Sequence, residues 1–269
     1  MTRLLALDFD GVIADSAPEA FVVAARTFAS LRPANAVAAA LAPLVAARTP
    51  TLAEVASHPL YRAFLDLMPL GNRAEDYGVA LDALEAGALL AEQADYDAWC
   101  DRIDREWLRS FHRAFYRVRA ALAEEDPAGW NALLGPYPIL PAMLRRRSRE
   151  VVLAIATAKD RHSVGKLLRS WGIDDLFPPD RVLDKEAGVR KTEHLAQLQR
   201  RFGIPYPEIT FLEDKLNHLD GAAALGVRCA LAAWGYNGER EIRLARERGY
   251  LVCSLEDVER QLFGSTAPA

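Results

Sequence analysis

Two aspartates lie two positions apart directly after a short apolar run near the N-terminus. The run Leu4–Leu7 is followed by Asp8, Phe9, Asp10 and Gly11. One carboxylate of such a pair could attack an electrophile while the other transfers a proton. Gly11 would let the backbone approach a ligand closely, and the amides of such a turn can bind a phosphate. Alone, the tetrad also fits a calcium loop or a polar turn, but its position after a buried strand favours the catalytic interpretation.

A second apolar run, Val151–Ala156, ends in Thr157, Ala158 and Lys159, which offer a hydroxyl donor and a cation. Taken alone, Thr157 is more typical of a helix N-cap. A single lysine such as Lys191, at the start of a later amphipathic stretch, is usually a solvated residue. Neither residue would by itself indicate a catalytic site.

A third apolar run, Ile209–Leu212, ends in the acidic pair Glu213 and Asp214. The carboxyl ends of parallel strands lie at one edge of a sheet, so this pair would meet Asp8 and Asp10 there. Four acids suit a hard divalent cation, and no Cys or His accompanies them as a softer metal would require. The pattern predicts a Mg²⁺ site.

The elements that would position these residues are short buried strands separated by helices. Alternation of this kind is typical of βαβ units, in which a parallel sheet carries helices on both faces. The expected strands are residues 4–7, 151–156, 181–183, 209–212 and 229–232, and the helices between them include residues 163–171 and 191–202.

A long segment between the first two strands has a different character. It is rich in Ala, Leu, Arg and Glu and contains no strand-like run. Apolar residues recur every three or four positions over residues 75–92 and 95–125, which predicts helices, and residues 33–47 suit an Ala-rich helix or pair of helices. We therefore expect two domains, one formed by residues 1–15 and 136–269 and the other by residues 16–135.

The composition limits the class of partner and the location. The 269 residues are 51% hydrophobic and 26% charged, as in ordinary globular proteins. The net charge of -4 and the absence of a basic stripe argue against nucleic acid. The three cysteines, Cys100, Cys229 and Cys253, form no CxxC pair of the kind found in zinc sites. We find no apolar run of about 20 residues that would suggest a membrane span, and no secretory signal. We expect a cytoplasmic protein that binds neither nucleic acid nor membrane, of undetermined oligomeric state.

The order and spacing of the motifs resemble the haloacid dehalogenase superfamily, in particular its phosphoglycolate-phosphatase-like members with a type 1 helical cap. The resemblance rests on the 8–12 motif, on Thr157 and a later lysine, and on the 213–214 pair. It covers about residues 1–16 and 136–260, and residues 233–236 after the last strand are also similar. It implies an α/β fold, with a Rossmann-like core containing a parallel sheet plus an inserted all-helical cap domain.

The resemblance also implies a role for each motif residue. Asp8 would attack phosphorus and become an aspartyl phosphate, while Asp10 would protonate the leaving oxygen and then activate water. Lys191 would balance the negative charge. The implied substrate-binding residues are Gly11, Thr157, Ala158 and Lys191, and the implied Mg²⁺ ligands are Asp8, Asp10 through its main-chain carbonyl, Glu213 and Asp214.

Three positions depart from the family pattern. Lys215 replaces a small hydroxyl residue, and we expect it to point to solvent. His218 stands where many relatives carry another acid. Lys191 precedes Thr192 rather than proline, and Lys185 lies six residues earlier, but the following helix and strand have the family spacing only if Lys191 is the motif lysine.

We therefore expect a Mg²⁺-dependent phosphatase of a small phosphorylated metabolite. Asp10 favours phosphate esters, because dehalogenases and phosphonatases of the superfamily lack an acid there, and residues 16–135 contain no lysine for a phosphonatase Schiff base. A β-phosphoglucomutase-like phosphomutase and a non-catalytic phosphate-binding protein share the motifs and stay open. Candidate substrate contacts in the cap are residues 71–73 and the cluster of His112, Arg113 and Arg117, although each is more typical of a solvated or helix-pairing residue.

Overall fold

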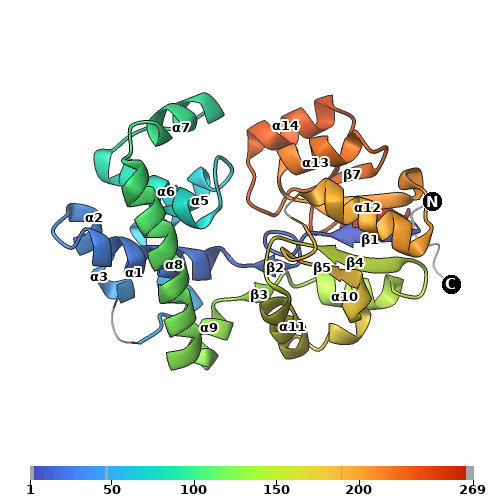
Figure 1. Ribbon diagram of the computed structural model, residues 1–269, viewed down its shortest axis with the longest axis horizontal. Coiled ribbons are helices and arrows are strands. Elements are labelled where there is room, and N and C mark those ends of the chain that lie inside the picture. The colour runs from blue at the N-terminus through green and yellow to red at the C-terminus, as the bar shows by residue number, and fades with distance from the viewer. Residues whose placement is uncertain (1–2, 46–47, 189, 265–269) are drawn as a thin grey trace. The chain divides into compact units, whose positions relative to one another are not determined.

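The chain folds into two compact units. The structure, a computed structural model, describes residues 3–45, 48–188 and 190–264 (Figure 1). Residues 1–15 and 136–269 form one unit, here called the α/β unit, and residues 16–135 form the other, the helical unit. No helix among the described residues is both long and apolar enough to span a membrane.

Six parallel strands form the sheet of the α/β unit, in the order β5-β4-β1-β6-β7-β8. They are β1 (Leu4–Leu7), β4 (Val152–Ala156), β5 (Val182–Leu183), β6 (Ile209–Glu213), β7 (Arg228–Ala232) and β8 (Leu251–Cys253). Every residue of β1 is buried, as expected for a central strand with both faces covered. The parallel α/β fold predicted from the sequence is confirmed, with β8 as an additional strand.

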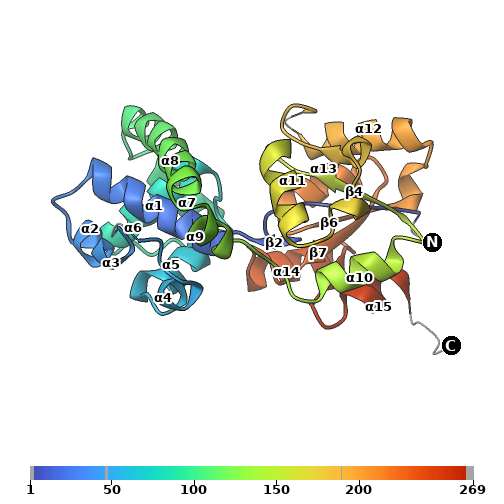
Figure 2. The same ribbon diagram turned by 90° about the horizontal axis from the view of Figure 1, so that it is seen from below.

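Helices cover both faces of this sheet. The helices of the unit are α10 (Leu140–Arg147), α11 (Arg161–Ser170), α12 (Lys191–Phe202), α13 (Leu216–Ala223), α14 (Glu239–Glu247) and α15 (Val258–Phe263). Figure 2 shows α12 and α13 on one side of the strands and α10 and α15 on the other. Leu195 and Leu198 of α12 pack with Leu219 of α13 against the strand residues, so the predicted amphipathic stretch 191–202 is a core helix.

The strand register determines where the motif residues lie. Leu7 at the end of β1 is level with Ile155 of β4 and with Leu212 of β6. The residues that follow these positions therefore leave the sheet at one carboxyl edge. Two short strands, β2 (Ala14–Asp15) and β3 (Gly135–Pro136), pair where the chain passes from one unit to the other.

The helical unit contains α1 to α9. They are α1 (Ala17–Leu31), α2 (Ala36–Ala40), α3 (Ala42–Val45), α4 (Leu52–Ala56), α5 (Pro59–Leu67), α6 (Ala74–Ala86), α7 (Gln93–Cys100), α8 (Arg105–Glu125) and α9 (Pro127–Ala132). Buried aromatic side chains such as Phe21 and Phe64 fill its core. The fully buried Glu19 of α1 accepts two hydrogen bonds from Arg119 of α8, at 2.7 and 2.6 Å, and one from Trp130 of α9 at 3.1 Å, so one carboxylate joins three helices.

Two helix predictions in this unit need correction. The stretch 95–125 is not one helix, because Asp104 caps a new helix by accepting hydrogen bonds from the amides of Glu106 and Trp107. The helix predicted over 75–92 ends at Ala86, since Gly87 takes a left-handed conformation with φ of 64°. The Ala-rich segment 33–47 forms the two short helices α2 and α3, with residues 46–47 outside the described residues.

Candidate active site

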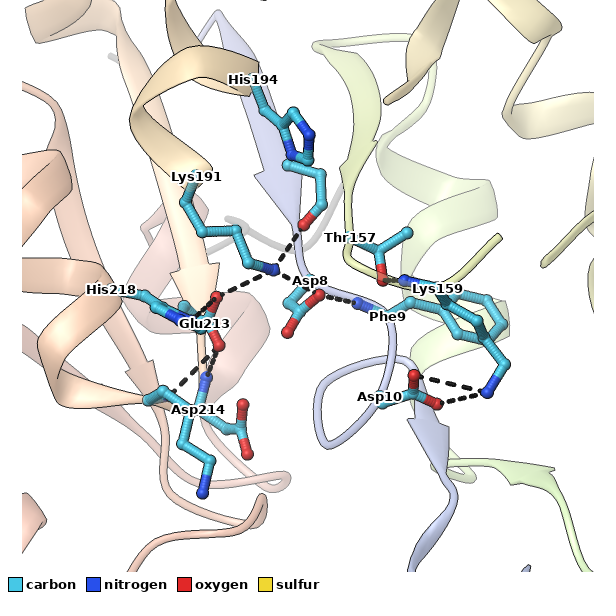
Figure 3. A network of polar contacts seen from close by, with 12 residues as sticks. Asp8, Phe9, Asp10, Thr157, Lys159, Lys191, His194, Glu213, Asp214 and His218 are labelled. Carbon is cyan, nitrogen blue, oxygen red and sulfur yellow. Dashed lines mark hydrogen bonds and ion pairs between the residues drawn. The ribbon is translucent and has the colours of Figure 1, made fainter. Parts of the chain in front are cut away.

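The candidate site lies at the carboxyl edge of the sheet (Figure 3). Asp8 follows β1 and Thr157 follows β4, while Glu213 is the last residue of β6 and Asp214 follows it. Lys191 reaches the same place as the first residue of α12. Residues separated by up to about two hundred positions in the sequence are thus brought together by the parallel register described above.

Lys191 connects two carboxylates of the site. Its Nζ lies 2.6 Å from Asp8 Oδ1 and 3.2 Å from Glu213 Oε2, and donates a hydrogen bond of 2.7 Å to the carbonyl of Ala156. The side chain is only 7% exposed, so its ammonium neutralises these groups with little screening by water. Lys185 is exposed and belongs to the loop before α12. The structure therefore brings Lys191, and not Lys185, to Asp8.

Three carboxylates gather tightly enough to hold a metal ion. One oxygen from each of Asp8, Glu213 and Asp214 lies within 4.8 Å of the others. Asp214 Oδ2 accepts a hydrogen bond of 2.8 Å from the amide of Tyr236, while its Oδ1 is buried without a hydrogen-bond partner among the described residues. Buried oxygens of this kind normally find a partner. An all-oxygen set with one such atom fits Mg²⁺.

Burial and mutual repulsion shift the acidity of the cluster. Burial, and then the charge of Glu213, raise the pKa of Asp8 to about 7, although Lys191 opposes the shift. Burial and Glu213 also raise the pKa of Asp214 well above its usual value. The pKa of Glu213 is lowered: burial opposes this, but Lys191 and then His218 outweigh it. A group of buried carboxylates with divergent pKa values is typical of functional sites.

Thr157 is nearly fully buried at the end of β4, and its Oγ1 accepts a hydrogen bond of 3.1 Å from the amide of Lys159. The hydroxyl hydrogen can then be donated to a ligand. Thr157 is not the helix cap that it suggests when taken alone, because Asp160 caps α11 by accepting from the amide of Ser163. Ala158 is exposed beside it.

Asp10 extends away from the carboxylate cluster. Its two oxygens lie 3.0 and 3.4 Å from Nζ of Lys159, and Figure 3 shows the carboxylate turned toward that lysine. The Lys159 side chain is 9% exposed. From its sequence position Lys159 is predicted only as a cation at the sheet edge, and its pairing with Asp10 follows from the tertiary structure.

Gly11 contributes space rather than a free amide. Its own N–H donates to the carbonyl of Ala14 at 2.8 Å, and its predicted part in substrate binding stays a prediction. Its φ is 82°, a left-handed conformation that favours glycine. A Cβ at this position would lie 2.5 Å from Asp214 Oδ2, which shows how closely the turn approaches the cluster.

Comparison with known proteins identifies the family. A sequence model described as "haloacid dehalogenase-like hydrolase" matches residues 2–226. The chain is a haloacid dehalogenase-like hydrolase. The resemblance drawn from the motifs is therefore confirmed. Among curated proteins, tyrosine-protein kinase PtkA of Mycobacterium tuberculosis and its Mycobacterium bovis counterpart are 31% identical over 128 residues. That match spans 44% of this chain but only 41% of the length of those relatives.

Solved structures share the fold of this haloacid dehalogenase-like hydrolase at low sequence identity. A predicted phosphoglycolate phosphatase from Haemophilus somnus is 17% identical with a TM-score of 0.60, each chain being covered to 96%. A haloacid dehalogenase-like family protein from Streptococcus pneumoniae is 14% identical with a TM-score of 0.63 and the same coverage of both chains. The likeness extends over both units of the chain.

Two departures from the family pattern take definite positions in this haloacid dehalogenase-like hydrolase. Lys215 is 8% exposed, and its Nζ donates a hydrogen bond of 3.0 Å to the carbonyl of Tyr236, so the expectation that it points to solvent is wrong. His218 Nδ1 lies 3.1 Å from Glu213 Oε2, with the side chain 39% exposed. Lys215 thus places its ammonium near Asp214, and His218 places a ring nitrogen beside Glu213.

The candidate substrate contacts of the helical unit are partly engaged within that unit. His112 Nδ1 lies 2.7 Å from Glu75 Oε2, and Arg113 pairs with Glu106 at 3.1 Å. Arg73, in the 71–73 loop, binds the carboxylate of Asp76 at 3.1 Å. Arg117 is exposed. These pairs agree with the expectation that such residues are solvated or pair with other helix residues.

Proposed function

We propose that this hydrolase is a Mg²⁺-dependent phosphatase that cleaves a small phosphorylated metabolite through an aspartyl-phosphate intermediate. The observation that supports this most directly is the carboxylate of Asp8 held by Lys191 beside Glu213 and Asp214. An anionic nucleophile attacks a phosphate dianion only where cations and hydrogen-bond donors offset both charges. Lys191 at 2.6 Å provides such a charge at the attacking group.

The proposed chemistry has two steps. An oxygen of Asp8 forms a bond to phosphorus as the bond from phosphorus to the ester oxygen breaks, and Asp10 donates a proton to the departing alcohol. Asp10 then accepts a proton from a water molecule that attacks the aspartyl phosphate, which releases phosphate and restores Asp8. The Thr157 hydroxyl, the Ala158 amide and Lys191 would bind the phosphate oxygens between the steps.

Mg²⁺ would be held by Asp8, Glu213 and Asp214 together with the main-chain carbonyl of Asp10. When bound, the ion supplies positive charge that offsets the repulsion between phosphate and nucleophile. Oδ1 of Asp214, which has no hydrogen-bond partner in the described part of the chain, and the purely oxygen ligand set support this assignment. We also propose that the helical unit is the cap that selects the substrate, and that the enzyme acts in the cytoplasm.

The test is phosphate release from a panel of esters, including phosphoglycolate, sugar phosphates and nucleotides, with Mg²⁺ or with EDTA. Asp8→Asn is the test variant, and Asp174→Asn, at an exposed position of the same unit, is the control. We expect a preferred ester whose hydrolysis requires Mg²⁺, survives in the control and disappears in Asp8→Asn. Hydrolysis by Asp8→Asn at the wild-type rate would refute the nucleophile. Failure of the folded wild-type chain to hydrolyse any ester would refute the phosphatase assignment.

A further inference from the structure

Lys215 places a second buried positive charge near the carboxylate cluster, in addition to that of Lys191. It directly follows Asp214, is 8% exposed, and donates from Nζ to the carbonyl of Tyr236 at 3.0 Å. The amide of that same Tyr236 donates to Asp214 Oδ2 at 2.8 Å. Because the two hydrogen bonds meet on one residue, Nζ of Lys215 lies within about 10 Å of the Asp214 carboxylate.

The loop that holds Lys215 in place is closely packed against the site. A Cβ on Gly235 would lie 2.4 Å from both Asp214 Cβ and the carbonyl oxygen of Gly11. Nε1 of Trp234 donates to the carbonyl of Val12 at 3.1 Å. The Tyr236 carbonyl that receives Lys215 is therefore part of a loop fixed at several points, and the ammonium is kept near the acids.

Two ammonium groups offset negative charge at the cluster without any added ion. Nζ of Lys191 pairs with Asp8 and Glu213, and Nζ of Lys215 lies within about 10 Å of Asp214, so two positive charges stand near three buried acids. The charge of Lys215 also lowers the pKa of Asp214, against the larger effects of burial and Glu213 that raise it. Buried carboxylates without such counter-ions would repel one another strongly.

We propose that Lys215 is a built-in counter-ion of the metal site, which stabilises the carboxylate cluster without Mg²⁺ and thereby weakens the binding of Mg²⁺. The inference rests on the metal assignment within the proposed function. Two like charges separated by less than about 10 Å at low effective dielectric repel strongly enough to change a binding constant tenfold or more. A rival account makes Lys215 a positioning residue that orients Asp214 through Tyr236, and it predicts the opposite sign.

The experiment titrates metal-free chain with MgCl₂ by isothermal calorimetry, and also measures the Mg²⁺-dependent increase in melting temperature. Lys215→Met and Lys215→Gln both remove the charge, so one variant suffices if the other does not fold. Lys185→Met removes the same charge from an exposed position and serves as the control. We expect both Lys215 variants to bind Mg²⁺ at least about tenfold more tightly than wild type, with the control within about twofold.

Unchanged or weaker Mg²⁺ binding in the folded Lys215 variants, with measurable binding by wild type, would overturn the counter-ion role while leaving the metal site intact. Weaker binding in particular would favour the positioning account. Absence of Mg²⁺ binding in wild type and all variants would instead refute the metal assignment itself, and the inference with it. Binding that appears only when Lys215 is replaced would support the proposal.

Discussion

Replacement of Gly235 by alanine is expected to disrupt the site without altering any charged group. The added Cβ would lie 2.4 Å from Asp214 Cβ and 2.4 Å from the carbonyl oxygen of Gly11. Contacts between such atoms are normally about 3.4 Å or longer, so the loop and the Gly11 turn must separate by about 1 Å. A displacement of about 1 Å of reacting groups can reduce a rate about 10²-fold, and overpacking of this kind costs about 1–3 kcal/mol of stability.

The assay compares Gly235→Ala with Gly165→Ala. Gly165 lies in α11, where the nearest atom to an added Cβ is Arg169 Nη1 at 3.4 Å, so alanine fits there and favours the helix. We expect Mg²⁺-dependent phosphate release to fall about 10²-fold in Gly235→Ala and to stay near wild type in Gly165→Ala. A Gly235→Ala enzyme with wild-type rate, Mg²⁺ affinity and melting temperature would show that the close approach of these loops has no role.

Two further predictions concern the buried charges. In EDTA, the free energy of unfolding of wild type, taken relative to that of Asp8→Asn, should fall as the pH rises from about 4 to about 7. The pKa of Asp8 is raised to about 7 in the folded state, so over this range the folded state keeps a proton that the unfolded state has lost. The expected slope is up to about 1.4 kcal/mol per pH unit. Urea unfolding across this range tests it, and a rise with pH would contradict the assignment. In the helical unit, Glu19→Gln should cost about 3 kcal/mol, since it leaves Arg119 without its buried partner. Glu54→Gln, at an exposed pair, should cost much less stability than Glu19→Gln, and equal losses in the two variants would argue against the importance of burial.

Features encoded locally were predictable from the sequence. Buried parallel strands are continuous apolar runs, so their ends, and therefore Asp8, Thr157 and Glu213, could be located before the structure was known. In the sheet, Leu7 pairs in register with Ile155 and with Leu212, which explains why the carboxyl ends of the three strands lie side by side. The strand β8 was not predicted; it lies at an edge of the sheet, and only Cys253 of its three residues is buried.

Features that depend on long-range pairing were not predictable. From the sequence, Lys215 is predicted to be a surface residue. Its burial is explained only by the hydrogen bond from Nζ to the carbonyl of Tyr236, which lies in the loop after β7. The pairing of Asp10 with Lys159 likewise joins segments far apart in the chain. The break between α7 and α8 was missed for a different reason: the apolar spacing continues across it, although α7 ends at Cys100 and Asp104 caps the start of α8.

The central position of β1 has a consequence for synthesis of the chain. Its neighbours in the sheet, β4 and β6, begin at Val152 and Ile209. At about 5–20 residues per second, roughly 10–40 s pass between translation of β1 and translation of β6. Until β4 is translated, the apolar run Leu4–Leu7 has no partner strand, and until β6 is translated it has a partner on one side only. Residues 16–135 can meanwhile fold as helices with local contacts. β1 is therefore without one of its two neighbouring strands until β6 is made, and Asp8, which follows β1, reaches its final surroundings only after that.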